Sequence, residues 1–174
     1  MSLTVNSCVT MTHTLPSFSR HITNIIKMRL ALFQPDIPQN TGAMIRICAC
    51  FEVGIDIIHP TGYVFSQKNI KQTAMDYLSL VSLEEHDSWD SYLKDNKGKR
   101  IILLSTKGKI KYSDFSFKED DCILVGRESA GVPDEVFNAA DEVITIPMSK
   151  NSRSLNVAVS AGIVLAETRR QLLK

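Results

Sequence analysis

The sequence predicts an α/β protein with a mostly parallel sheet covered by helices on both faces. From Arg29 onward, short apolar runs alternate with segments of helical periodicity. The strands within 121–133 and 142–158 both end in loops rich in Gly, Ser and Asn, as parallel strands do where they hold an organic ligand. The first half of the last helix is apolar almost all round, which indicates burial on more than one side.

Each element of this fold has its own signal. Short apolar runs bounded by Pro, Gly or Asn predict strands at Arg29–Phe33, Ile55–Ile58, Arg100–Leu104, Cys122–Val125 and Val143–Ile146, and a shorter one at Tyr77–Val81. Helical spacing and start or stop residues predict helices from Asn40 to Gly54, over Gln67–Met75, from Asp87 or Ser88 to Leu93, from Pro133 to Ala140, and over Ser154–Leu173. We expect Asn40 to be the N-cap of the first helix.

Length and composition are those of one globular domain, which we place at residues 28–174. No stretch approaches the ~20 apolar residues of a membrane span, so no membrane association is expected. The net charge of +1 says little about partners, because nucleic-acid binding requires a local basic patch. Two lysine clusters offer such a patch or form an ordinary solvated surface: Lys94/Lys97/Lys99/Arg100 and Lys107/Lys109/Lys111.

The four cysteines and four histidines show no zinc-site spacing, so we expect no metal. Cys48, Cys50 and Cys122 fall in apolar runs, which is typical of small buried side chains in a reducing cytosol. Residues 1–27 are rich in Ser and Thr and loosely fit a transit peptide. They are equally well interpreted as a disordered tail or as an upstream start, with Met28 the true first residue.

The Gly-rich turn at 126–131 has the spacing G-x-x-x-x-G. It is neither the dinucleotide fingerprint nor a Walker loop, and by itself it indicates only a tight turn. Three strand ends strengthen the case for a ligand, because Leu104, Val125 and Ile146 each lead into a loop at the same sheet edge. Apolar walls with backbone donors and acceptors suit an adenine ring.

Polar residues on two helices extend this candidate site. Ser154 and Asn156 precede the last helix, where they either orient a ligand or cap the helix. Arg46 follows Asn40 by six positions on a mostly apolar helix. Because an arginine among core residues needs an acceptor, we expect a carboxylate, a phosphate or a loop carbonyl beside it.

Four segments of the chain, QPDIPQNTGAMIR, LSTKG, LVGRESAGVP and IPMSKNSRSLNVAVS, occur in this order. Together they closely resemble the SPOUT RNA 2′-O-ribose methyltransferases, and within them the tRNA (cytidine/uridine-2′-O-)-methyltransferase branch that acts on the wobble nucleotide. The resemblance covers Met28–Lys174. One departure is Arg127, which stands where many relatives in this branch have proline.

The resemblance implies a deep trefoil knot and a homodimer whose interface builds the active site. It also implies a cytoplasmic enzyme that uses S-adenosylmethionine, releases S-adenosylhomocysteine and methylates a tRNA anticodon stem-loop. The family's cofactor contacts fall on Leu104, Gly126, Ile146, Met148, Ser154 and Leu155. Its RNA-facing and catalytic polar residues fall on Asn40, Arg46, Glu128 and Asn156.

A guanidinium is a poor base, so we expect Arg46 to clamp a phosphate and stabilise the developing oxyanion. Ribosomal RNA is an alternative substrate, and a non-catalytic RNA-binding relative is an alternative of another class. A Rossmann-like oxidoreductase fits less well, because the chain lacks the glycine fingerprint and its acidic partner.

Overall fold

The computed structural model describes residues 27–66, 69 and 73–173 of the chain. The tail predicted at 1–27, apart from Lys27, lies outside the described residues, as does most of the helix predicted at Gln67–Met75.

The described residues form one seven-stranded sheet in which every pair of neighbouring strands is parallel. The strand order is β3-β2-β1-β6-β4-β7-β5, which puts β1 and β6 side by side in the middle. The strands are β1 (Arg29–Phe33), β2 (Gly54–Ile58), β3 (Leu83–His86), β4 (Ile101–Leu104), β5 (Ile110–Lys111), β6 (Cys122–Val125) and β7 (Glu142–Thr145). The predicted parallel α/β architecture is confirmed, while the knot stays a prediction.

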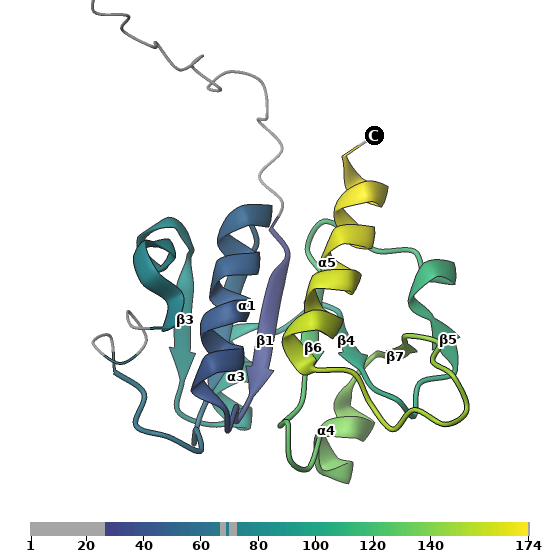
Figure 1. Cartoon of the computed structure of the whole chain (residues 1–174), viewed down its shortest axis with the longest axis horizontal. Helices are drawn as coiled ribbons and strands as arrows, with labels where there is room; N and C mark the ends of the chain where they lie inside the picture. Colours follow the sequence, from purple (N-terminus) through teal and green to yellow (C-terminus); the bar gives the residue numbers. More distant parts are fainter. Residues whose placement is uncertain (1–26, 67–68, 70–72, 174) are drawn as a thin grey trace, which may run out of the picture.

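Helices cover both faces of the sheet. They are α1 (Pro38–Phe51), α3 (Trp89–Asp95), α4 (Asp134–Ala139) and α5 (Val157–Leu172), with short 3-10 turns η1 (Met75–Leu80) and η2 (Tyr112–Asp114). In Figure 1, α1 and α5 lie side by side in front of the sheet. Their apolar side chains join one core cluster, whereas those of α3 and α4 join a second cluster.

Alternation along the strands separates these two clusters. In β1, Leu30 and Leu32 belong to the α1/α5 cluster, whereas Ala31 and Phe33 belong to the α3/α4 cluster. Because successive side chains of a strand point to opposite faces, a short continuous apolar run can fill both cores. This explains why β6 is apolar throughout and why β1 is apolar after Arg29, so that both were predictable as buried strands.

Several predicted boundaries are wrong. Asn40 is not an N-cap: α1 begins at Pro38, with Pro38 in the first turn and Ile37 as the N-cap residue. The helix ends at Phe51, and Glu52 adopts a left-handed conformation (φ 57°), so Gly54 instead opens β2. At the other end of the chain α5 begins at Val157 and not at Ser154, and of the two candidate caps, Ser154 and Asn156, it is Asn156 that caps the helix.

The strands at the two edges of the sheet, β3 and β5, also differ from the prediction. Residues 77–81, predicted as a short strand, lie mostly in η1, and the strand β3 follows at Leu83–His86. The short strand β5 was not predicted. Both missed strands lie at the edges of the sheet and carry charged side chains, which weakens the apolar signal.

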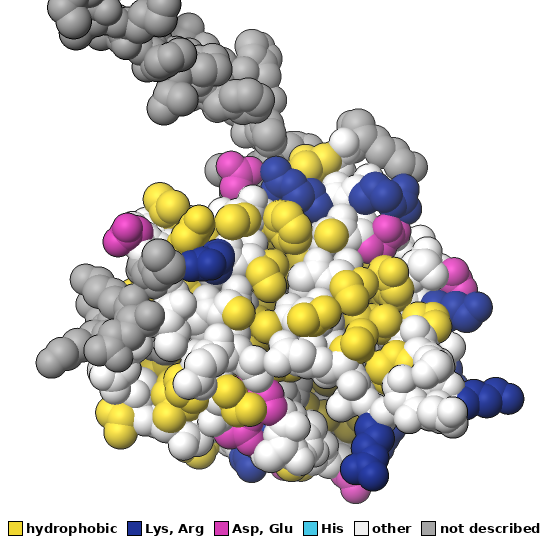
Figure 2. Space-filling view, viewed as in Figure 1, with side chains coloured by type: hydrophobic (Ala, Val, Ile, Leu, Met, Phe, Trp, Pro, Cys, Tyr) yellow, Lys and Arg dark blue, Asp and Glu magenta, His cyan; other side chains and the backbone are white. Residues whose placement is uncertain are grey.

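The face that carries α1 and α5 exposes hydrophobic side chains across its middle (Figure 2). Ile37, Leu155 and Val159 are among the large hydrophobic residues that are at least 40% exposed, and they lie at or near the starts of these two helices. None of the helices in the described ranges combines the length and the apolar character that a membrane span requires.

Candidate active site

A cavity of about 510 Å³ opens at the carboxyl ends of β4, β6 and β7, where the chain leaves the sheet for its connecting loops. This volume lies in the usual range for sites that bind small organic ligands. The lining comes from the ends of β4, β6 and β7, from the loops after these strands and after β1, from α1 and α4, and from the first turn of α5: Ile37, Asn40, Leu104, Ser105, Thr106, Lys107, Val125, Gly126, Arg127, Glu128, Ala130, Gly131, Val132, Phe137, Thr145, Ile146, Met148, Ser154, Leu155, Asn156, Val157 and Ser160.

All six residues predicted to bind a cofactor line this cavity: Leu104, Gly126, Ile146, Met148, Ser154 and Leu155. Leu104, Ile146 and Met148 are only partly buried, so their apolar surface is not filled by the protein itself. Ser154 adds a hydroxyl at the start of α5. Such walls suit a ligand with an apolar ring and a polar end, as S-adenosylmethionine has.

The turn after β6 owes its shape to two glycines. Arg127 and Gly131 exchange two backbone hydrogen bonds of 2.9 Å, so the loop folds back on itself. A Cβ atom on Gly126 would lie 2.6 Å from the carbonyl carbon of Gly131, and Gly131 itself has φ of +68°. Only glycine tolerates the close contact at position 126 and the positive φ at position 131. The two glycines therefore allow the tight loop that places Glu128 at the cavity wall.

Three of the four predicted catalytic residues form one hydrogen-bonded row in the cavity. Asn40 donates from Nδ2 to Oε1 of Glu128 over 3.0 Å, and Asn156 donates from Nδ2 to Oδ1 of Asn40 over 2.9 Å. The Oδ1 atom of Asn156 accepts the backbone N–H groups of Ala158 and Val159, which caps α5. The row thus links the starts of α1 and α5 to the loop after β6.

A second carboxylate, Asp36, lies behind Glu128. The hydrogen bond with the Glu128 side chain and, to a smaller extent, the hydrogen bonds from Ser129 lower the pKa of Asp36 to about 2. Burial raises the pKa of Glu128 above its ordinary value, and the neighbouring Asp36 raises it further. Of the two groups, Glu128 therefore holds a proton to the higher pH.

The structure does not place Arg46 in this row. Among the described residues that line the cavity Arg46 is absent; it is exposed on α1 with its guanidinium carbon 5.0 Å from the centre of the Tyr77 ring. The expectation of an arginine among core residues is therefore wrong. The helix does carry apolar residues, but Arg46 lies outside its buried stripe of Thr41, Gly42, Met44, Ile45 and Cys48.

Two cations line the cavity, and each lies over an aromatic ring. The guanidinium carbon of Arg127 is 5.8 Å from the centre of the Phe33 ring, and Nζ of Lys107 is 5.9 Å from that of Phe137. Both side chains are exposed. They give the mouth of the cavity a positive character that suits phosphate groups.

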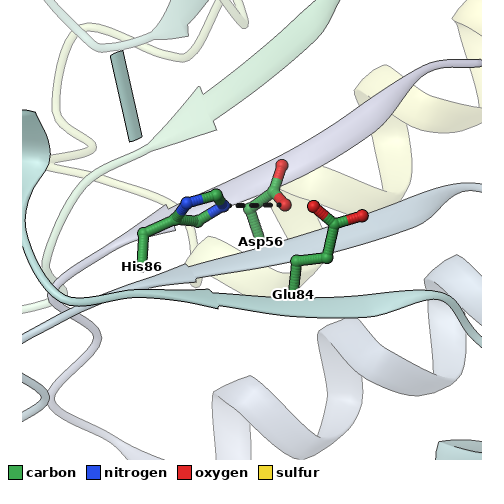
Figure 3. A group of neighbouring side chains, drawn as sticks. All are labelled: Asp56, Glu84 and His86. Carbon is green, nitrogen blue, oxygen red and sulfur yellow. Dashed lines mark hydrogen bonds and ion pairs between the residues drawn. The ribbon is translucent and has the colours of Figure 1, made fainter. Parts of the chain in front are cut away.

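A second cluster of ionisable groups lies away from the cavity, on β2 and β3 (Figure 3). Asp56, Glu84 and His86 place ligand atoms within 4.8 Å of one another, which in type suits a metal ion. However, Arg29 already serves as the cation: its Nε donates to both carboxylate oxygens of Asp56 at 2.9 Å, and its Nη1 lies 3.0 Å from Glu84. The Nε2 atom of His86 lies 3.3 Å from the same Asp56. We interpret this cluster as a structural charge network.

Sequence reasoning missed two contributors to the site. Asp36 lies in the quoted segment QPDIPQNTG, but nothing in the residue pattern distinguishes it from a turn residue after Pro35. Lys107 lies in the quoted segment LSTKG, but it was named only as part of a possible basic patch and not as a site residue. Its place directly after the strand ending at Leu104 was the available signal, because residues at the carboxyl ends of parallel strands gather at one edge.

Comparison with known proteins gives consistent similarities. Residues 27–166 match the model of the SpoU rRNA Methylase family. The chain is 48% identical over 145 residues to the tRNA (cytidine(34)-2′-O)-methyltransferase of Beijerinckia indica subsp. indica, which covers 82% of this chain and 91% of that protein.

Solved structures are similar in fold as well. One, described as giving structural insights into the 2-OH methylation of C/U34 on tRNA, has a TM-score of 0.80 and 36% identity and covers 84% of this chain and 96% of the other. An AdoMet-bound rRNA methyltransferase from Sinorhizobium meliloti has a TM-score of 0.76 and 25% identity over 85% of this chain and 57% of its own.

Proposed function

Since this chain belongs to the SpoU rRNA Methylase family, we propose that it transfers a methyl group from S-adenosylmethionine to the ribose 2′-oxygen of nucleotide 34, a cytidine or uridine, of tRNA. The observation that supports this most is the convergence of the six cofactor positions and the row Asn156–Asn40–Glu128 on one cavity. We propose position 34, the wobble nucleotide, because the relative at 48% identity and the solved structure at 36% identity are both described by this position.

We infer that the half-buried side chains of Leu104 and Ile146 enclose the adenine of the cofactor. Gly126, where a side chain would collide with Gly131, leaves room for the cofactor to approach the backbone, and Ser154 offers a hydroxyl to a polar group. When bound, S-adenosylmethionine supplies a methyl group already activated by its sulfonium.

The protein's own contribution is orientation, charge stabilisation and water exclusion. Asn40 and Glu128, fixed to each other, present polar atoms that can hold the ribose in a single orientation. Alignment of this kind contributes up to about 7–11 kcal/mol in favourable cases. Arg46 binds a phosphate and stabilises the developing charge on the 2′-oxygen, because its planar guanidinium donates to two oxygens at once but offers no lone pair to accept a proton.

The RNA approaches over the two cations that line the cavity. Lys107 and Arg127 are exposed, and within the described residues neither takes part in an ion pair with a carboxylate. Each phosphate that such a cation neutralises releases counterions, so binding weakens as salt rises. A local patch of this kind removes the difficulty posed by a net charge of +1.

We further infer that the enzyme works as a homodimer in the cytoplasm. The face over α1 and α5 exposes Leu155 and Val159, beside the cavity residue Asn156, and an apolar face of this kind fits a second copy of the chain. Arg46, exposed on α1 and outside its own cavity, would then serve the cavity of the partner. The free thiols of Cys48, Cys50 and Cys122 suit a reducing compartment.

Two measurements test the activity. Titration calorimetry with S-adenosylmethionine separates an enzyme from a non-catalytic RNA-binding relative, which would give no heat of binding. Incubation of the enzyme with labelled cofactor and, in parallel, with total tRNA or ribosomal RNA separates the two substrate classes. We expect cofactor binding and labelled tRNA; labelled ribosomal RNA with unlabelled tRNA would exclude the proposed substrate.

A further inference from the structure

Asp36 and Glu128 hold each other by reciprocal hydrogen bonds between backbone and side chain. The backbone N–H of Asp36 donates to Oε2 of Glu128 over 3.1 Å, and the backbone N–H of Glu128 donates to Oδ1 of Asp36 over 3.2 Å. The two residues are 92 positions apart in the chain. A reciprocal pair of this kind fixes both the distance and the rotation of the two segments relative to each other.

Ser129 adds two more hydrogen bonds to Asp36. Its backbone N–H donates to Oδ2 of Asp36 over 3.4 Å, and its hydroxyl donates to the same oxygen. Both carboxylate oxygens of Asp36 are therefore engaged by the loop that follows β6. A carboxylate that accepts several N–H and O–H groups is the stronger kind of hydrogen-bond acceptor.

The placement of the two carboxyl groups differs in a way that matters for function. Glu128 lines the cavity, whereas Asp36 is not among the described residues that do. The other carboxylate oxygen of Glu128, Oε1, accepts a hydrogen bond from Asn40, and Asn40 in turn accepts one from Asn156. Asp36 therefore stands at the outer end of the row, hydrogen-bonded to Glu128.

We propose that Asp36 is a positioning residue for methyl transfer, which acts by fixing the side chain and loop of Glu128 at the cavity wall. This rests on the proposed function, because it assigns Asp36 a part in the same site. Asp36 itself touches neither cofactor nor RNA. Its removal lowers the turnover number more than it lowers the affinity for either ligand, since both ligands keep their own contacts.

Two substitutions of Asp36 separate the hydrogen bonds that its carboxylate accepts from Glu128 and Ser129. Asp36→Asn retains one oxygen for the N–H of Glu128 but replaces the acceptor used by Ser129 and removes the negative charge. Asp36→Ala removes both acceptors. Neither change affects the backbone N–H of Asp36, so one hydrogen bond to Glu128 remains in both variants and supports folding.

The kinetic test is a double-mutant cycle on the full chain with Asp36→Ala, Glu128→Ala and the double variant. We expect Asp36→Ala to lower kcat by roughly 10- to 100-fold, as small misplacements of a site do, with KM for tRNA and Kd for S-adenosylmethionine within about threefold. Because Asp36 acts through Glu128, the double variant should be no slower than Glu128→Ala alone. Rate losses that multiply in the double variant overturn the proposal.

A spectroscopic test does not depend on activity. In protein labelled with ¹³C at glutamate carboxyl groups, Glu128→Gln identifies the Glu128 signal, and its titration is then followed by NMR. Asp36→Asn takes a negative charge away from Glu128, so the pKa of Glu128 should fall. The matched control, Asp134→Asn, removes an exposed carboxylate in the first turn of α4 and should leave that titration unchanged.

These arms also separate failure of this proposal from failure of the proposed function. If the wild-type protein methylates no tRNA but the pKa of Glu128 still shifts in Asp36→Asn, the contact between Asp36 and Glu128 is supported and the proposed reaction is excluded. An unchanged Glu128 titration, or an Asp36→Ala variant with wild-type kcat, overturns the positioning role while leaving tRNA methylation intact.

Discussion

Asn156 donates a hydrogen bond of 2.9 Å to the side-chain oxygen of Asn40, although 116 positions separate them in the sequence. The same Asn156 caps α5, while Asn40 lies in the first turn of α1. One side chain thus has two separable tasks, because its oxygen serves the helix and its amide nitrogen serves the cavity. This division makes the site testable without unfolding the protein.

Variants of Asn156 should separate helix stability from methyl transfer. Asn156→Ala removes the cap and should cost about 1 kcal/mol, or roughly 2–4 °C in Tm. Asn156→Asp keeps an acceptor at the cap but loses the donor to Asn40, so Tm should hold while kcat falls by roughly 10-fold or more.

Thermal melts and single-turnover rates measure the two effects. The control is Ser88→Ala, which removes the side-chain cap of α3 and should lower Tm without changing the rate. Equal rates for wild type and Asn156→Asp would show that the contact with Asn40 has no part in catalysis.

Arg46 offers a test of the dimer. Mixed dimers are prepared from Arg46→Ala and Asn156→Ala chains, each of which we expect to be slow on its own. If each Arg46 serves the cavity of its partner, every mixed dimer has one complete site, and a random mixture regains about a quarter of the wild-type activity. If Arg46 serves its own cavity, the mixture stays as slow as its parents.

Arg46→Lys, which keeps the charge and loses the bidentate fork, should also be slow, whereas Arg170→Lys at the exposed end of α5 should not.

Gly126→Ala should block the cofactor site. The new Cβ atom would lie 2.6 Å from the backbone of Gly131, so the loop must move at a cost of about 1–3 kcal/mol. Calorimetry should show the affinity for S-adenosylmethionine reduced by about tenfold or more. Gly162→Ala is the matched control, since its Cβ atom meets only the flexible end of Ile47 at 3.4 Å. Unchanged affinity in Gly126→Ala would place the cofactor elsewhere.

The charge network on β2 and β3 should support folding and need no metal. Asp56 is fully buried, and Arg29 keeps only 11% of its side chain exposed, so Asp56→Ala takes away the buried partner of this cation and leaves it the exposed Glu84. The free energy of unfolding should fall by about 3–5 kcal/mol, whereas Glu84→Ala, at a side chain 57% exposed, should cost less than about 1 kcal/mol. Chelator should leave the Tm of wild type unchanged; a lower Tm would indicate a bound metal ion.

The central strands could be predicted because burial on both faces makes them continuously apolar, as in Cys122–Val125, whose bounds agree with β6. The edge strand Leu83–His86 escaped prediction because two of its four residues are exposed glutamates. Asparagine is a preferred N-cap residue, yet the Asn40 side chain binds Glu128, because this tertiary hydrogen bond competes successfully with a local bond to the helix backbone.

The candidate site was predictable as far as the motifs reach. All six predicted cofactor positions and three of the four predicted catalytic residues meet in one cavity, as loops at the carboxyl ends of parallel strands do. The location of Arg46 depends on how α1 turns against its neighbours, and helical spacing alone does not fix whether a side chain faces a cavity of its own chain. The reciprocal contact of Asp36 joins loops 92 positions apart, and no local pattern encodes it.

The central claim is methylation of the ribose at position 34, and nucleoside mapping tests it most directly. Wild-type enzyme is incubated with labelled S-adenosylmethionine and a tRNA transcript bearing cytidine 34, and the product is digested and resolved by mass spectrometry. We predict a single 2′-O-methylcytidine at position 34, and none from a transcript that carries a 2′-deoxyribose there. A methyl group on the base, or the same yield from the 2′-deoxy transcript, would contradict the account.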